Sequence, residues 1–378
     1  MAVTQHSGRT EQRARLFAVL QERGLDAAVM TSYQAVSYFA GTNIITQTAL
    51  PERLEFCVLF ADGTAALLLC NIETGMAITQ TDIEDVNEYV EFAILPALAL
   101  ADLLKERGLV RGRIGIESRR LHSEAYLDLR KALPDVELVP LDEEVEEVQS
   151  VKTPDELEKL RSAAQTTLQA VLDAAGRAQP GVSELSVAAD ISAQVTRKGG
   201  IYVFMVFSSG RRALGAHVEA ADLPLEEGTI WRVDLGSRFF EVINSDLARV
   251  GVVGTPSARQ SEIMAALHAI QQAGFAVIEP GRPACDVFRA VEREFATQNL
   301  PFFMPHVGHG LGIGLHEAPI LEPNNTTPLE PGMVVNVEPM IRLDDEGECY
   351  HTEDLAHVTA DGYELLTTPQ EELIVIES

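Results

Sequence analysis

The stretch that decides the fold runs from residue 230 to residue 253 and reads IWRVDLGSRFFEVINSDLARVGVV. Its apolar runs, residues 229–235 and 241–253, predict two neighbouring buried strands, yet each run contains a carboxylate, Asp234 in the first and Asp246 in the second. Burying a carboxylate is costly unless it is paired or binds a cation. The two acids therefore indicate a site, and not only a core.

The same pattern returns near the C-terminus. Residues 334–340 and 353–358 predict two more strands, and these contain Glu338 and Glu353. Four buried carboxylates in one region have too few nearby lysines and arginines to pair with, so a shared metal centre is the economical interpretation.

A glycine-rich run, PHVGHGLGIGLHEAP at residues 305–319, lies between the two strand pairs and presents His309. Alternating glycines let the backbone pass close to a ligand or to another segment. We do not interpret the run as a dinucleotide-binding fingerprint, because no strand–helix–strand unit surrounds it.

Two domains are expected from the length of 378 residues and from the change in pattern along the chain. The first part alternates helices and strands, which predicts an α/β domain with a hairpin across Ala61-Asp62-Gly63. An acidic run at residues 143–147, interpreted as a solvated helix or loop face, precedes the boundary. Thr153, Pro154 and Glu156 then form a capping-box signal for a helix reaching about residue 176.

The second part has strand pairs, then two helices at 257–272 and 285–299, then further strand pairs ending in a hairpin at Asp361-Gly362. This order predicts an α+β domain and not a doubly wound sheet. We place the domains at residues 1–150 and 151–378.

The formal charge is −28, with 29 basic against 57 acidic residues. Such a surface repels nucleic acid and anionic membranes, so neither is an expected partner. The polar N-terminus has no apolar core of a secretory signal, and the longest apolar stretch, residues 92–104, is broken by Pro96 and Asp102. The four cysteines lack CxxC spacing and are interpreted as reduced thiols, so we expect a cytoplasmic protein.

Five residues in five local motifs resemble the metal ligands of the pita-bread metallopeptidases: Asp234, Asp246, His309, Glu338 and Glu353. That family includes methionine aminopeptidases, aminopeptidase P and the Xaa-Pro dipeptidases (prolidases), with creatinase as a metal-free relative. The N-terminal α/β domain is similar to the one in prolidase, aminopeptidase P and creatinase, which favours Xaa-Pro dipeptidase. The resemblance implies an α+β pita-bread catalytic domain preceded by a smaller creatinase-like α/β domain, and a homodimer.

The resemblance also implies two divalent metal ions, with Mn first and Co, Zn or Fe as alternatives. Asp234 would bind one ion and His309 the other, Asp246 and Glu353 would bridge them, and Glu338 would bind the His309 ion and act as general base. A metal-bridging hydroxide would be the nucleophile.

Three further histidines match family positions. His217 and His316 are expected to stabilise the tetrahedral intermediate or the substrate carbonyl, and His306 to line the substrate site. The remaining histidines are expected to be structural hydrogen-bonding residues: His6, His122, His268, His351 and His357.

Three departures from the family pattern concern the substrate more than the metals. Ala248 stands where a threonine is usual, and Met340 follows Glu338-Pro339 in place of glycine. Ile320 replaces the arginine that binds the substrate carboxylate in many prolidases. Arg211, Arg212 and Arg342 are candidate replacements, of which Arg212 and Arg342 are taken as substrate-binding residues.

The expected function is hydrolysis of the Xaa-Pro bond of dipeptides or short peptides. One alternative is a creatinase-type C–N hydrolase acting on a small non-peptide amide. Another is a non-catalytic binding protein that keeps the pita-bread shell.

Overall fold

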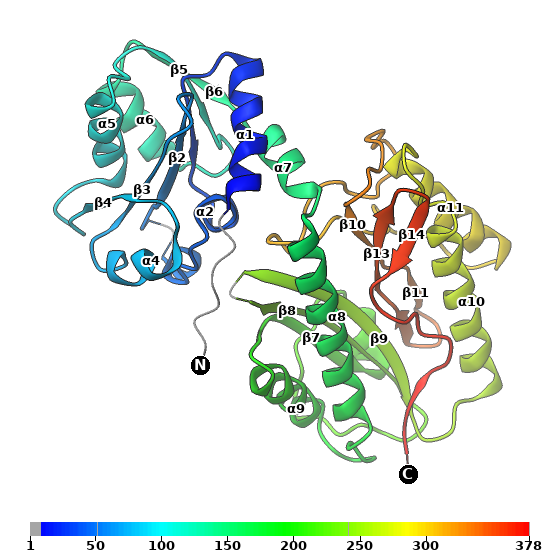
Figure 1. Cartoon of the computed structure of the whole chain (residues 1–378). Coiled ribbons are helices and arrows are strands. Elements are labelled where there is room, and N and C mark those ends of the chain that lie inside the picture. Colours follow the sequence, from blue (N-terminus) through cyan, green and yellow to red (C-terminus); the bar gives the residue numbers. More distant parts are fainter. Residues whose placement is uncertain (1–8, 51, 241, 378) are drawn as a thin grey trace. The chain divides into compact units, whose positions relative to one another are not determined.

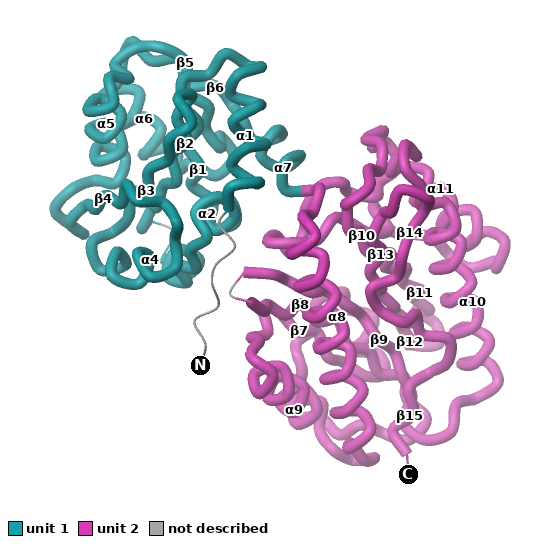
Figure 2. Tube along the Cα trace, viewed as in Figure 1, with its two compact units in different colours: residues 1–149 teal, residues 150–378 magenta. Residues whose placement is uncertain are grey.

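The computed structural model describes residues 9–50, 52–240 and 242–377. The chain divides into two compact units, residues 1–149 and residues 150–378 (Figure 2). Among the described residues, no helix combines the length and the apolarity that crossing a membrane requires.

Unit 1 is built on a six-stranded mixed sheet with strand order β4-β3-β2-β1-β5-β6. Its strands are β1 (Ala27–Met30), β2 (Phe56–Phe60), β3 (Ala65–Cys70), β4 (Asp85–Tyr89), β5 (Gly112–Ile116) and β6 (Val136–Pro140). Its helices are α1 (Thr10–Arg23), α2 (Tyr33–Ala40), α3 (Thr46–Ala49), α4 (Thr74–Gln80), α5 (Pro96–Glu106), α6 (Ser123–Ala132) and α7 (Asp142–Ser150). The predicted hairpin is confirmed, because β2 and β3 pair antiparallel across residues 61–64. The acidic run lies in α7.

Glu55 is the exception in the apolar core of unit 1. It comes directly before β2, its side chain is fully buried, and neither carboxyl oxygen has a hydrogen-bond partner among the residues that the structure describes. Burial, reinforced by the charge of Glu73 and opposed by Arg53, raises the pKa of Glu55 to about 9. The side chain is therefore held in its neutral form in the folded protein at neutral pH.

We expect Glu55→Gln to remove a pH-dependent loss of stability. The folded pKa lies above the unfolded value, so stability is fully present below about pH 4.5 and falls as pH rises toward 9, by about 1.4 kcal/mol per pH unit. Between pH 5 and pH 8, the free energy of unfolding of the variant should therefore rise relative to that of the wild type by the same amount per pH unit. Urea unfolding of both proteins measures this difference. Glu88→Gln, at an exposed position of β4, is the control. Parallel pH profiles of wild type and Glu55→Gln would refute the expectation.

Unit 2 contains three sheets, with strand orders β15-β9-β8-β7, β10-β13-β14 and β11-β12. Its first half comprises α8 (Pro154–Ala175), α9 (Glu184–Arg197), β7 (Ile201–Ser209), the short 3₁₀ helix η1 (Gly210–Leu214), β8 (Ile230–Phe239) and β9 (Ile243–Val253). Its second half comprises α10 (Ala258–Phe275), α11 (Ala284–Thr297), β10 (Val334–Val337), β11 (Met340–Leu343), β12 (Glu348–His351), β13 (Asp354–Thr359), β14 (Gly362–Leu365) and β15 (Ile374–Ile376). Strand pairs, helices and strand pairs follow one another, so the α+β prediction is confirmed.

The helices of unit 2 pack against its sheets, as the green and yellow ribbons of Figure 1 show. Helix α8 begins as predicted: the Thr153 hydroxyl accepts from the Glu156 backbone N–H, and the Glu156 carboxylate accepts from the Thr153 N–H. Helix α8 contacts β9, α9 contacts β7, and α10 contacts β10 and β12. Strand β9 is buried along its whole length, including its polar residues Asn244, Ser245, Asp246 and Arg249.

The predicted single strand at residues 334–340 is wrong. The chain forms β10 and β11, which belong to different sheets, and Glu338-Pro339 is the break between them. Proline has no N–H for a ladder hydrogen bond, and the Glu338 N–H donates instead to the Val307 carbonyl. The predicted strand start at Glu241 lies outside the described residues, and β12 was not predicted.

Candidate metal centre

Three carboxylates meet where β8, β9 and the start of β13 come together. Asp246 lies opposite Gly236, two positions from Asp234 on β8, so both aspartates lie on the same face of the pair. The Glu353 N–H donates to the Ala248 carbonyl at 3.1 Å, which brings Glu353 to β9. One carboxylate oxygen from each of Asp234, Asp246 and Glu353 lies within 4.8 Å of the others.

His309 reaches the same site from the glycine-rich run, and Asn336 holds it there. The His309 N–H donates to Asn336 Oδ1 at 2.6 Å, and the Asn336 N–H donates to the His309 carbonyl. The ring Nδ1 lies 2.9 Å from the Gly310 carbonyl, so this nitrogen carries the proton. Nε2 is therefore the unprotonated nitrogen, and its lone pair accepts from Asn336 Nδ2 at 2.9 Å. Nε2 is for the same reason the nitrogen that suits a metal.

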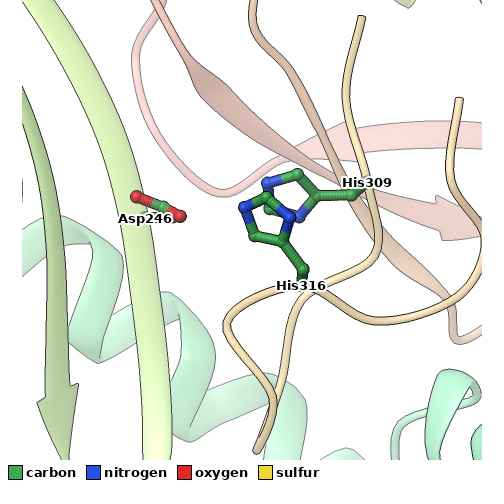
Figure 3. Close-up of side chains that lie close together, drawn as sticks. All are labelled: Asp246, His309 and His316. Carbon is green, nitrogen blue, oxygen red and sulfur yellow. The ribbon is translucent and has the colours of Figure 1, made fainter. Parts of the chain in front are cut away.

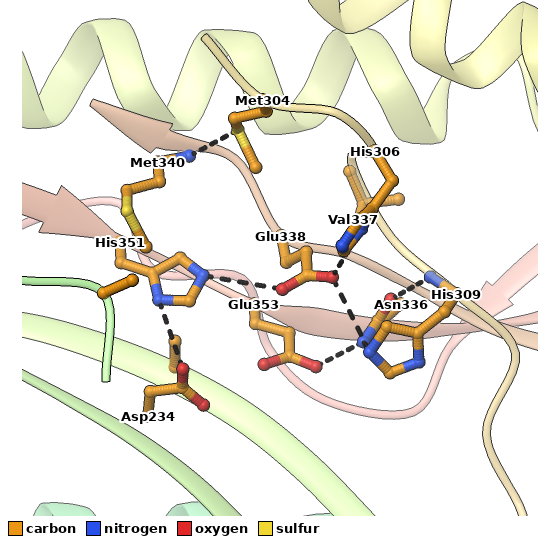
Figure 4. A network of polar contacts seen from close by, with 12 residues as sticks. Asp234, Met304, His306, His309, Asn336, Val337, Glu338, Met340, His351 and Glu353 are labelled. Atoms are coloured by element: carbon orange, nitrogen blue, oxygen red, sulfur yellow. Dashed lines mark hydrogen bonds and ion pairs between the residues drawn. The ribbon is translucent and has the colours of Figure 1, made fainter. Parts of the chain in front are cut away.

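Glu338 joins the acidic cluster to two further histidines (Figure 4). Its Oε1 lies 3.4 Å from His306 Nδ1 and 3.6 Å from His309 Nε2. Its Oε2 lies 3.8 Å from Nε2 of His351, whose Nδ1 is 3.9 Å from Asp234 Oδ2. His351 thus stands between carboxylates from β8 and from the β10–β11 break.

A second group of potential ligands shares Asp246 with the first (Figure 3). Asp246, His309 and His316 have ligand atoms within 4.8 Å of one another, and the two imidazole rings stack with centroids 3.7 Å apart. His316 is exposed and, with His217, lines a pocket of about 1060 Å³ whose other walls are mostly apolar side chains of α9 and β7. The pocket therefore opens beside the acidic cluster.

The electrostatics of the cluster are those of acids crowded together away from water. Burial and the charge of Glu338 raise the pKa of Asp234 to about 7, and burial with neighbouring acids raises the pKa of Asp246 and of Glu353 well above the ordinary range. For Glu338, burial is outweighed by the contacts with His306, His309 and His351, which lower its pKa. Burial lowers the pKa of His309 to about 4, so its ring is neutral.

These residues fit divalent metal ions. Three buried carboxylates and the partly buried Glu338 repel one another, and among the described residues Asp246 Oδ1, Glu338 Oε1 and both nitrogens of His351 have no hydrogen-bond partner. Carboxylate oxygens with a neutral imidazole form a ligand set that suits Mn²⁺, Co²⁺, Fe²⁺ or Zn²⁺. A bound cation would compensate both the repulsion and the unpartnered oxygens.

The structure brings all five predicted ligands into one network, and His306 contacts Glu338 within it. The two predicted arginines have partners outside the acidic cluster. Arg212 contacts the Glu184 carboxylate and donates to the Glu219 carbonyl, and Arg342 pairs with Asp344 at 2.6 Å. Their assignment to substrate binding stays a prediction.

Sequence reasoning missed two residues of the network, Asn336 and His351. Each lies two positions before one of the predicted acids, Asn336 before Glu338 and His351 before Glu353. Residues i and i+2 of an extended chain lie on the same face, so this spacing was the available signal. His351 was expected to be structural, but its ring lies among the acids.

The fold and this site define a two-domain protein with a buried centre of acids and an imidazole suited to divalent metals. Residues 158–360 match the metallopeptidase family M24, and residues 12–151 match the creatinase/prolidase N-terminal domain. The chain belongs to the metallopeptidase family M24. Both the recognition of this family and the two-domain pita-bread architecture predicted from the sequence are thereby confirmed.

Relatives match along nearly the whole chain. The uncharacterized peptidase YqhT of Bacillus subtilis is 30% identical over 97% of this chain and 99% of its own length. The Xaa-Pro dipeptidase of Pyrococcus furiosus is 28% identical, covering 96% of this chain and 99% of the relative. The solved structure of the Xaa-Pro dipeptidase from Bacillus anthracis is 26% identical, with a TM-score of 0.86 over 97% of this chain and 100% of that one.

Proposed function

We propose that this protein is a dinuclear-metal-dependent peptidase that hydrolyses the Xaa-Pro bond of dipeptides or short peptides. The observation that carries the proposal is the crowding of four carboxylates, three of them buried, around an imidazole whose Nε2 is presented to them. Relatives named Xaa-Pro dipeptidase, similar over almost their full length, support the substrate class.

In this proposal, Asp234, Asp246, His309, Glu338 and Glu353 would hold the two ions, and Asp246 and Glu353 would be shared between them. Asp246 suits that role because it belongs to both groups of potential ligands. When bound, two such ions supply a Lewis acid for the scissile carbonyl and a hydroxide nucleophile at neutral pH.

The protein's own side chains carry out the remaining steps of the reaction. Glu338 acts as general base and holds the proton removed from the attacking water, and its contact with His306 keeps it ionised beforehand. His217 and His316 line the pocket beside the cluster, where they can donate hydrogen bonds to a carbonyl oxygen as it gains charge. The apolar walls of the pocket exclude water from the bond being cleaved.

Manganese is the proposed metal, because four carboxylates make a hard oxygen-rich ligand set. A homodimer is the proposed state, as the resemblance to the family implies, and the cytoplasm is the proposed location, because the four cysteines are free thiols.

We expect metal removal and return to switch the activity off and on. Dialysis against a chelator should lower Xaa-Pro hydrolysis at least about 100-fold, because the charge stabilisation supplied by the ions amounts to several kcal/mol. Added Mn²⁺ should restore it. The assay is release of the first residue from Xaa-Pro dipeptides and from Xaa-Pro-Yaa tripeptides, with matched Xaa-Ala peptides as controls.

Creatine and small ureido compounds in the same assay test the creatinase-type alternative. Turnover of those compounds alone would overturn the peptidase proposal. Metal binding without turnover of any compound would favour the binding-protein alternative.

A further inference from the structure

His217 lies in a segment whose backbone is held by two buried charged side chains. We call residues 209–221 the His217 segment. It contains η1 and then runs without regular structure, and His217 itself is exposed. An exposed imidazole on an irregular segment has no packing of its own to fix it, so its position depends on what holds the backbone.

Glu184, the first residue of α9, holds both ends of the His217 segment. Its side chain is fully buried. Oε1 accepts from the N–H and the hydroxyl of Ser209, each at 2.8 Å. Oε2 accepts from the Ala221 N–H at 3.1 Å and from Arg212 Nε at 3.3 Å. One carboxylate therefore joins the start and the end of the segment.

Arg232 holds the middle of the same segment. Its Nε donates to the Ala213 carbonyl at 3.1 Å, and its Nη2 donates to the carbonyls of Gly215 and Ala216, the latter at 2.6 Å. These carbonyls come immediately before His217. Arg232 is fully buried and stands two positions before Asp234 on β8, so both side chains leave the same face of that strand.

The buried charge of Arg232 is costly for the fold. A buried guanidinium is costly to desolvate, and Arg232 donates its hydrogen bonds to neutral carbonyls of an irregular segment and not to a carboxylate. The guanidinium presents several donors in a rigid plane, whereas a lysine presents three donors on a single nitrogen at the end of a flexible stem. The hydrogen bonds of Arg232 connect β8, the strand that carries Asp234, to the backbone immediately before His217.

We propose that Glu184 and Arg232 are positioning residues that hold His217 in place for the reaction. The inference rests on the proposed function, in which His217 acts on the substrate. Arg232 ties the segment to the strand that carries Asp234, so the backbone at His217 keeps a constant place relative to that strand. Displacing a catalytic group by about 1 Å can lower the reaction rate about 100-fold, so loss of these contacts should have a measurable effect on the rate.

The first test is independent of activity. Hydrogen exchange of the full-length protein is measured for peptides that cover residues 209–221. Arg232→Met and Glu184→Gln should each speed exchange in this segment at least about 10-fold. Arg249→Met removes the other fully buried arginine of the same sheet, which does not contact the segment, and should leave exchange there unchanged. Unchanged exchange in the first two variants would overturn the proposal.

The second test is a double-mutant cycle with His217→Ala on an Xaa-Pro peptide. Arg232→Met should lower kcat about 10- to 100-fold in the wild-type background and less than about 2-fold in the His217→Ala background. Arg232→Lys, which keeps the charge but not the fork, should behave as Arg232→Met does. Mn²⁺ affinity, measured by calorimetry, should not weaken in either variant.

Equal losses of kcat in both backgrounds, or weakened Mn²⁺ binding, would overturn the positioning role. A wild-type enzyme that hydrolyses no Xaa-Pro peptide contradicts the proposed function instead, and the exchange experiment then decides on the contacts alone.

Discussion

Asp246→Asn is expected to abolish turnover and to weaken the binding of both metal ions. Asp246 is the residue common to the two groups of potential ligands, so one substitution removes an oxygen from each. Its Oδ1 is buried without a hydrogen-bond partner in the described part of the chain, which marks it as a ligand position and not part of a hydrogen-bonded framework. We expect activity to fall at least about 1000-fold, with Mn²⁺ affinity falling about 10- to 100-fold or more.

The metal-free variant should remain folded. Asparagine has nearly the volume of aspartate, and the change removes one of four acids that repel one another in the absence of ions. Thermal unfolding of the metal-free proteins therefore separates loss of metal from loss of fold. Asp345→Asn, at an exposed acid in the loop between β11 and β12, is the control. A variant of Asp246 that still binds two ions and turns over substrate would show that the chemistry does not use this centre.

Glu338→Gln is expected to lower kcat while leaving substrate binding largely intact. Glu338 lies at the break between β10 and β11, where its carboxylate contacts His306 and His309. Glutamine keeps the size and one acceptor oxygen but cannot take up a proton at neutral pH. Loss of a general base typically lowers the rate about 100- to 10,000-fold, and we expect a fall in that range in kcat with KM changed less than about 5-fold.

Metal analysis of the same variant separates two roles of Glu338. If the variant retains both ions and loses kcat, Glu338 acts on the proton. If it loses one ion, its ligand role dominates, and added Mn²⁺ at high concentration should then recover part of kcat. Glu330→Gln, an exposed glutamate before β10, should match the wild type. Full activity of Glu338→Gln with both ions bound would contradict the assignment of the base.

The acidic centre was predictable because its members violate the pattern around them. Asp234 and Asp246 interrupt apolar runs, and a buried acid needs a compensating partner wherever the strand lies. The capping box at Thr153 and the turn at Asp62-Gly63 were predictable for a different reason. Their hydrogen bonds and dihedral preferences involve residues close together in sequence.

The break at Glu338-Pro339 was not predictable from the apolar pattern alone. Residues 334–340 read as one strand, and only the pairing of β10 with β13 and of β11 with β12 shows that two sheets part there. The partners of Arg212 and Arg342 were likewise undetermined, because a surface arginine can engage whichever acid or carbonyl the fold brings near it.

The sequence by itself determined the two-domain α/β and α+β organisation, the local caps and turns, and the identity of the five candidate ligands. Tertiary structure alone decided that Asn336 holds His309, that His351 stands between two acids, and that Glu184 and Arg232 hold the His217 segment. The physical reason is the range of the interactions. Caps and turns act within a few residues, and the penalty for a buried charge applies wherever its strand lies. The contacts that position a side chain instead join distant segments, such as Glu184 to Ala221 and Ala248 to Glu353.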